Sequence, residues 1–218
     1  MISKELTTYI ESLIPKRSDL LLEMEEYAQI HHVPIMDLIG MEALLQILRL
    51  KKPKKILEIG TAIGYSAIRM AETVENITVY TIERDQERYV EAEKNIEKAH
   101  LTERIHIIKG DALESFEAVQ PFGPFDALFI DAAKGQYKRF FELYSTLLSK
   151  DGLVLSDNVL FRGFVAQNEE EINQTRYRSM VKKLKNYNEW LVNHPNYQTT
   201  ILPVGDGLAV SIKKGELE

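Results

Sequence analysis

Acidic residues recur along the chain at the ends of short apolar runs. Five of them share this position: Glu58, Glu83, Asp111, Asp131 and Asp157. A single acid at such a place is equally well explained as a helix cap. Because ligands of open parallel sheets bind beyond the carboxyl ends of the strands, five acids in five consecutive units predict a polar ligand site along one edge of a sheet.

The first acid is followed by a glycine turn, Glu58-Ile59-Gly60-Thr61-Ala62-Ile63-Gly64-Tyr65-Ser66. Gly60 permits a sharp turn close to a ligand, and Gly64 lets the next helix begin tightly against it. The third glycine of the dinucleotide fingerprint is missing, and an acid before the turn would repel a diphosphate. The same carboxylate suits the cationic amino acid part of S-adenosylmethionine. We therefore expect that cofactor to bind at Glu58, Gly60, Thr61, Gly64 and Ser66.

Two further acids fit the rest of the same cofactor. Glu83 follows the glycine turn by roughly 20 residues, where a carboxylate accepts the ribose hydroxyls in nucleotide-binding α/β folds. Asp111 and Ala112 come after the next strand, where an adenine would stack. The alternative of a nicotinamide oxidoreductase is disfavoured by Glu58 and by the missing third glycine.

The elements that must position these residues alternate between strand and helix. Apolar runs at 56–59, 79–82, 105–108, 127–130 and 153–155 predict strands, and segments at 67–74, 88–99, 112–119 and 137–148 predict helices between them. A long helix over about 170–192 precedes two last strands, at 199–202 and 208–212. The Gly205-Asp206-Gly207 turn between these predicts an antiparallel hairpin.

This pattern predicts an α/β fold of the Rossmann-like class I methyltransferase type. We expect a seven-stranded, mostly parallel sheet that ends in the antiparallel hairpin and has helices on both faces. Residues 1–52 read as N-terminal helices and 53–218 as the catalytic core, together one domain.

Composition limits the chemistry. The chain has 218 residues, no cysteine and a formal net charge of −6. A metal must therefore bind to oxygen or imidazole ligands, and His31-His32 reads as a helix-end pair. There is no signal-like start and no apolar run of about 20 residues, so we expect a cytoplasmic protein without a membrane partner.

Four segments carry a family resemblance: Leu57-Glu58-Ile59-Gly60-Thr61, Phe129-Ile130-Asp131-Ala132-Ala133-Lys134, Asp157-Asn158-Val159-Leu160 and Leu202-Pro203-Val204-Gly205-Asp206-Gly207-Leu208. With them the chain resembles the cation-dependent O-methyltransferases typified by the catechol and caffeoyl-CoA enzymes. The resemblance implies that Asp131, Asp157 and Asn158 chelate Mg²⁺ (or Mn²⁺), and that Lys134 stands beside the reacting hydroxyl. It also implies that the stretch 34–48, with Met36, folds over the methyl donor, and that the chain forms a homodimer.

The chemistry of these residues agrees with that implication. Two carboxylates and an amide oxygen form a partial shell that Mg²⁺ accepts. A substrate with two adjacent oxygens can complete the shell, and the metal then lowers the pKa of the hydroxyl and orients it. Lys134 can take the proton or stabilise the oxyanion.

Basic residues gather late in an otherwise acidic chain: Arg162, Arg176, Arg178, Lys182 and Lys183. They form either a solvated face or a phosphate-binding surface for RNA or an acyl-CoA tail, and Tyr177 could stack on a base. The whole chain also resembles the bacterial tRNA 5-hydroxyuridine methyltransferases. This implies the tRNA anticodon region as partner and 5-methoxyuridine at the wobble position as product. The alternatives are a small-molecule, catechol-type O-methyltransferase and a non-catalytic RNA-binding protein on the same scaffold.

Overall fold

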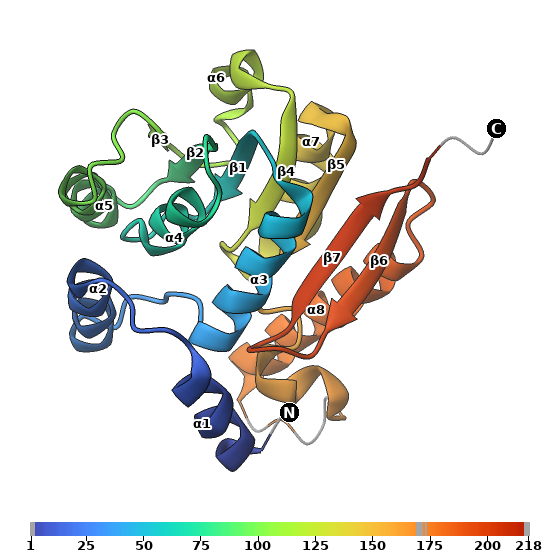
Figure 1. The fold of residues 1–218 in the computed structure, drawn as a ribbon. Coiled ribbons are helices and arrows are strands. Elements are labelled where there is room, and N and C mark those ends of the chain that lie inside the picture. Colours follow the sequence, from blue (N-terminus) through green and yellow to red (C-terminus); the bar gives the residue numbers. More distant parts are fainter. Residues whose placement is uncertain (1–2, 169–171, 173, 216–218) are drawn as a thin grey trace.

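A seven-stranded sheet forms the centre of the computed structural model, which describes residues 3–168, 172 and 174–215. The strands lie in the order β3-β2-β1-β4-β5-β7-β6 (Figure 1). Parallel pairing joins β1 (Lys55–Ile59), β2 (Thr78–Glu83), β3 (Ile105–Lys109), β4 (Phe125–Ile130) and β5 (Leu148–Ser156). The last two, β6 (Tyr197–Leu202) and β7 (Leu208–Lys213), pair antiparallel, and β7 is also antiparallel to β5. The predicted fold class is confirmed.

Both faces of the sheet are covered, because successive strand residues feed two separate apolar clusters. Ile56 and Phe129 pack with the N-terminal helices, α4 (Tyr65–Thr73) and α5 (Gln86–Lys98). Their neighbours Leu57 and Leu128 pack on the other face with α7 (Tyr137–Tyr144) and α8 (Thr175–Val192). Strands buried on both faces read as continuous apolar runs, which is why the central strands are easily found in the sequence.

Three helices precede the sheet: α1 (Lys4–Leu13), α2 (Asp19–Ile30) and α3 (Leu38–Lys51). The Ser18 hydroxyl caps α2 by accepting a hydrogen bond from the Leu21 N–H at 3.4 Å. Helix α3 buries one side against the sheet, whereas α1 buries no residue and exposes large apolar side chains, among them Leu6, Tyr9 and Leu13.

The homodimer stays a prediction, which light scattering in solution would test.

Three predicted helices differ from the structure. The one over 137–148 is α-helical only to Tyr144, and Leu148 already belongs to β5. Over 112–119 only α6 (Phe116–Val119) is helical, because the Asp111 carboxylate accepts the Leu113 N–H at 2.9 Å and holds a turn there. The long helix begins at Thr175 rather than near 170, and residues 169–171 and 173 lie outside the described part of the chain. His31 ends α2 as expected, with its ring stacked on Tyr27. Within the described ranges, no helix has both the length and the apolar character needed to cross a bilayer.

Candidate functional site

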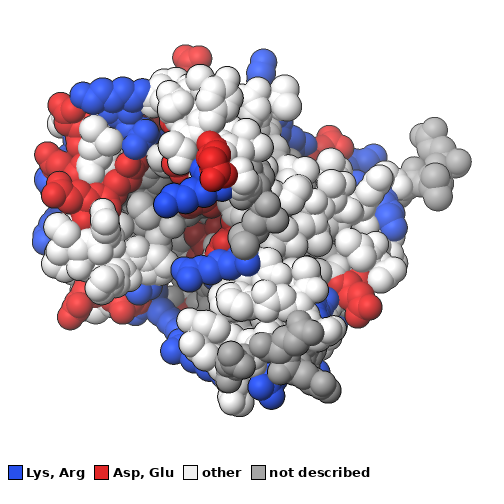
Figure 2. All heavy atoms as spheres, turned by 90° about the horizontal axis from the view of Figure 1, so that it is seen from below, with Lys and Arg blue, Asp and Glu red and all other residues white. Residues whose placement is uncertain are grey.

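A cavity of about 380 Å³ opens at the carboxyl ends of β1, β2 and β4. Figure 2 looks onto this side of the molecule and shows a hollow with acidic atoms inside and basic side chains on its rim. The structure brings together most of the residues that the sequence predicted here. Those that line the cavity are Met36, Gly60, Thr61, Ser66, Glu83, Asp111, Ala112, Asp131, Lys134 and Asn158.

The glycine turn packs directly against the end of β4. Gly60 has a φ of +105°, and a Cβ on it would lie 2.1 Å from the carbonyl oxygen of Asp131. The Gly60 N–H also donates to the Ile82 carbonyl of β2 at 3.1 Å. A residue with a side chain could not make this turn at this distance, so glycine is required to bring the turn and Asp131 to one wall of the cavity.

Glu58 and Gly64 do not line the cavity, which corrects the expectation that they touch the ligand. Glu58 is fully buried and accepts hydrogen bonds from the hydroxyls of Ser66 (2.5 Å) and Thr81 (2.6 Å). Burial raises the pKa of Glu58 to about 7, although these two hydrogen bonds oppose the shift. Gly64 begins α4 with a φ of +86° and faces Ala92 of α5. Glu58 therefore lies behind the cavity wall and holds Ser66, which lines the cavity, by a hydrogen bond.

Glu83 is held rigidly at the cavity. Its carboxylate accepts the Ala62 N–H and the Asp85 N–H, both at 2.8 Å, and the side chain is almost fully buried. Two fixed backbone donors orient the carboxylate and leave its remaining lone pairs free for ligand hydroxyls. The pKa of Asp111, farther along the same wall, is lowered first by the hydrogen bond from the Leu113 N–H and then by Arg84 at 3.2 Å.

Asp131, Asp157 and Asn158 come together after β4 and β5. Asp157 is 1% exposed; its Oδ2 accepts a 2.5 Å hydrogen bond from the Asn158 amide, and its Oδ1 has no hydrogen-bond partner. Burial raises the pKa of Asp131 to about 6, and burial together with the charge of Asp131 raises that of Asp157 well above its usual range.

These residues fit a divalent cation. A buried carboxylate oxygen without a partner is costly, and two neighbouring carboxylates repel each other. A cation bound between them would remove both costs, with oxygen ligands of the kind that Mg²⁺ prefers. Across the described ranges, no group of three or more His, Cys, Asp or Glu side chains is placed to hold a metal. The candidate site has two carboxylates and an amide.

Lys134 lies on the same wall, at the start of the short 3-10 helix η2 (Lys134–Gln136). Its positive charge opposes the rise in the pKa of Asp131 and of Asp157 that burial causes. A Cβ added to Gly135 would be 3.3 Å from the Nζ of Lys183, a residue of α8. Lys183 therefore lies beside Gly135, the residue that follows Lys134 of the cavity wall.

Other parts of the predicted basic surface are engaged elsewhere. The Arg178 guanidinium donates to the Ile172 carbonyl at 2.9 and 3.1 Å, and the Tyr177 ring packs against Phe161 and Phe164. Two guanidinium donors of Arg178 are therefore used within the chain, although the residue stays exposed, and Tyr177 is not a free stacking platform. Lys182, Lys183, Arg176 and Arg162 remain exposed.

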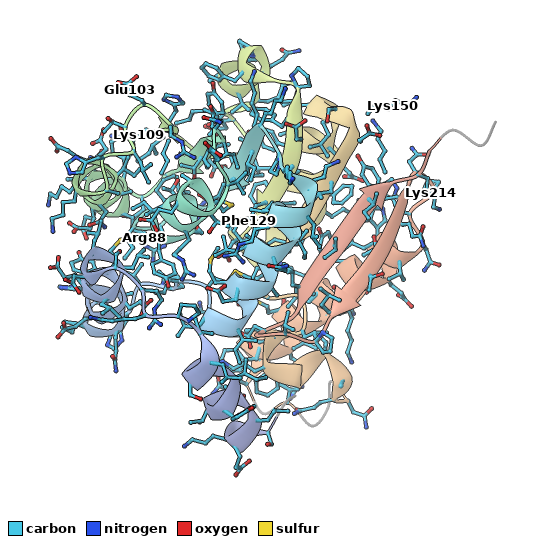
Figure 3. The ribbon with its side chains drawn as sticks, viewed as in Figure 1. Arg88, Glu103, Lys109, Phe129, Lys150 and Lys214 are labelled. Atoms are coloured by element: carbon cyan, nitrogen blue, oxygen red, sulfur yellow. The ribbon has the colours of Figure 1, made fainter. Side chains whose placement is uncertain are left out.

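Two arginines of the cavity wall, Arg84 and Arg88, were not among the predicted site residues. Arg88 lies on the side of α5 that faces α2 (Figure 3). Their position directly after Glu83 and in the first turn of α5 was the available signal, because the first helical turn after a strand borders the ligand edge of such a sheet.

Comparison with known proteins gives a consistent result. A family described as O-methyltransferase matches residues 12–214. A crystal structure of a provisionally named caffeoyl-CoA O-methyltransferase from Staphylococcus aureus is 42% identical, with a TM-score of 0.88 over 97% of this chain and 98% of that one. An O-methyltransferase from Bacillus cereus, solved with S-adenosylhomocysteine (SAH), is 25% identical, with a TM-score of 0.82 over 96% and 97%. The catechol O-methyltransferase of Niastella koreensis is 35% identical over 180 residues, which are 78% of each chain.

A doubly wound sheet that ends in an antiparallel pair, with an acid-lined cavity at its carboxyl edge, defines the class I methyltransferases, which use S-adenosylmethionine. Within that class the chain belongs to the O-methyltransferase family. It is an S-adenosylmethionine-dependent O-methyltransferase.

Proposed function

We propose that this O-methyltransferase requires a divalent cation, Mg²⁺ or Mn²⁺, and methylates 5-hydroxyuridine at the wobble position of tRNA to 5-methoxyuridine. The observation that carries the metal requirement is the buried Oδ1 of Asp157, which has no hydrogen-bond partner, in a carboxylate whose other oxygen is bonded by Asn158 and whose pKa is raised by burial and by Asp131. An acceptor with two adjacent oxygens suits such a site. The 5-hydroxyl and 4-carbonyl of 5-hydroxyuridine form such a pair, as do the two hydroxyls of a catechol.

The methyl donor would occupy the cavity between the glycine turn and Met36. Glu83 would accept hydrogen bonds from the ribose hydroxyls, and Asp111 and Ala112 would border the adenine. Ser66, whose hydroxyl donates to Glu58, would contact the amino acid part. Such an arrangement places the donor methyl toward Asp131 and Lys134, at the end of the cavity where the acceptor must enter.

Methyl transfer then depends mainly on positioning. A cation held by Asp131, Asp157 and Asn158 would lower the pKa of the acceptor hydroxyl. Lys134 would take the hydroxyl proton or stabilise the oxyanion, since it lines the same cavity as Asp131 and Asn158. The walls keep acceptor and donor in contact, which in oriented reactions contributes on the order of 7–11 kcal/mol. As the methyl–oxygen bond forms, the methyl–sulfur bond breaks and its electron pair stays on sulfur.

The basic rim supports a nucleic acid as the acceptor. Lys183 lies next to Gly135, which stands between the two cavity-lining residues Lys134 and Gln136, and Lys182 and Arg176 are also exposed on α8, in a chain whose net charge is −6. Cations around a cavity that admits a single base would bind the phosphates on either side of it. A catechol-type small molecule is the second candidate, because a catechol O-methyltransferase is among the relatives.

The deciding experiment offers both acceptors to the protein. Labelled S-adenosylmethionine is incubated with a catechol and with tRNA from a strain that lacks this gene, and the nucleosides are analysed by mass spectrometry. The proposal expects 5-methoxyuridine in the tRNA and far slower catechol turnover. Catechol turnover with unmodified tRNA would establish the small-molecule function instead, and no transfer to either would favour the non-catalytic alternative.

A matched pair of variants tests the rim. Lys182→Glu/Lys183→Glu should weaken tRNA binding and flatten its salt dependence by about one unit of slope for each phosphate that is no longer neutralised. The control, Lys94→Glu/Lys98→Glu, makes the same change of charge on two lysines of α5 with exposed side chains. It should leave tRNA binding close to wild type, and both variants should keep their SAH affinity. Equal loss in the two variants would show a general effect of net charge.

A further inference from the structure

One wall of the donor cavity is a segment outside any helix or strand. Pro34, Ile35 and Met36, here called the strap, lie in the connection between α2 and α3 and line the cavity together with the glycine turn. Met36 is 4% exposed. Because this wall belongs to no helix or strand, it lacks backbone hydrogen bonds of regular structure, and its position depends on the contacts at its two ends and on the packing of Met36.

The residue after the strap, Asp37, has two contacts that fix the strap's end. Its Oδ1 caps α3 by accepting the Gly40 N–H at 3.0 Å. Its Oδ2 lies directly on Gly205, in the turn 203–207 of the C-terminal hairpin: a Cβ on Gly205 would be 2.0 Å from that oxygen. Because the cap holds the carboxylate in place, it cannot move away from Gly205 without giving up its bond to Gly40.

The turn 203–207 is itself tied to the loop that follows β5. The Leu160 N–H donates to the Asp206 carbonyl at 2.8 Å, and the Val159 N–H donates to the Gly207 carbonyl at 3.0 Å. Gly207 also faces Leu160 so closely that a Cβ would lie 2.4 Å from the Leu160 Cγ. The turn is therefore a firm support, and Asp37 lies near enough to Asp157 for its charge to contribute to the raised pKa of that residue.

The geometry points to Asp37 as a positioning residue that holds the strap closed over the methyl donor by docking on Gly205. The cap sets the direction of the carboxylate, and the absence of a side chain at Gly205 provides the space that it fills. When the contact is broken, the strap keeps only the apolar cluster that Met36 shares with Leu208 of the C-terminal hairpin, and the donor escapes faster. This inference depends on the assignment of the cavity to the methyl donor, and it is independent of the acceptor.

The test uses SAH binding by the full chain, measured by calorimetry and by stopped-flow dissociation. Loss of an Asp cap has effects that correspond to roughly twofold to thirtyfold in an equilibrium constant, so Asp37→Ala should weaken SAH binding by roughly tenfold. Most of the loss should appear as faster dissociation, as is usual for changes within one binding site. Asp37→Asn should stay within about threefold of wild type, because asparagine caps helices as well as aspartate does and has nearly the same shape.

A double-mutant cycle isolates the contact. Gly205→Ala should weaken SAH binding about as much as Asp37→Ala, because the new methyl group displaces the carboxylate. The combined variant should be no weaker than Asp37→Ala alone, since nothing is left to displace. Ser18→Ala is the control, because it removes the cap of α2 without touching the strap and should leave SAH dissociation unchanged. Wild-type dissociation in Asp37→Ala, or additive losses in the combined variant, would overturn the inference.

Discussion

Gly60 offers the most quantitative test of how the site is built, because Gly64 provides an internal control. Both glycines have positive φ, +105° and +86°, but their surroundings differ. A Cβ on Gly60 would lie 2.1 Å from the Asp131 carbonyl oxygen and 2.9 Å from its carbon, both backbone atoms. A Cβ on Gly64 would meet nothing closer than the Ala92 Cβ at 3.5 Å, which is an ordinary contact.

The expected magnitudes follow from these distances. An L-residue at positive φ costs about 1–2 kcal/mol, and this is the whole expected cost of Gly64→Ala. Gly60→Ala adds a collision with backbone that can be relieved only by moving the end of β4, and overpacking of this kind typically costs about 1–3 kcal/mol. We therefore expect a loss of about 1–2 kcal/mol for Gly64→Ala and about 2–5 kcal/mol for Gly60→Ala.

Urea unfolding of both variants measures the difference in their free energies of unfolding. Calorimetry shows whether the cavity still binds SAH after its wall has been displaced. A domain usually has a stability of about 5–15 kcal/mol, so Gly60→Ala stays folded when the wild type lies above the lower end of this range, and its own urea curve shows whether it does. SAH binding should be lost in Gly60→Ala and retained in Gly64→Ala. If the two variants differ in stability by less than about 0.5 kcal/mol, which is the usual error of additivity, the turn relaxes freely and the argument from close packing is wrong.

Three other predictions address single side chains. Glu83→Ala should weaken SAH binding by roughly 1.5–3 kcal/mol, as expected for the removal of charge-assisted hydrogen bonds; unchanged affinity in calorimetry would remove Glu83 from the ribose role. Glu58→Gln should change the pH dependence of stability. The folded-state pKa of Glu58 is raised from 4.5 to about 7, so its protonated form favours folding at low pH and this contribution is lost as the pH rises through 7. The variant should therefore gain up to about 3 kcal/mol on wild type between pH 4.5 and 8, and a constant difference in urea unfolding at these two pH values would contradict this. Lys134→Ala should lower turnover strongly with little change in SAH affinity, whereas Lys138→Ala, on the exposed side of α7, should resemble wild type in single-turnover assays.

Much of this fold can be read from the sequence because its signals are local. The central strands are buried on both faces, so their apolar runs mark them without further information. The acids at the strand ends, together with Gly60, indicate without any tertiary contact which edge of the sheet binds the ligand. Glu83, Asp111 and Asp131 were predicted at the cavity, and all three line it.

Tertiary structure decided everything that depends on segments far apart in the chain. Glu58 is predicted in the same way as Glu83, yet it lies behind the wall, because the hydroxyls of Ser66 and Thr81 from two other elements enclose it. Arg178 donates hydrogen bonds to the Ile172 carbonyl. Strand β7 lies between β5 and β6 although it is the last strand in the chain. Asp37 meets Gly205 only because α3 and the C-terminal hairpin pack at the same end of the sheet. Residue spacing specifies which face of its own element a side chain occupies, whereas its partners depend on how whole elements pack together, and no local pattern contains that information.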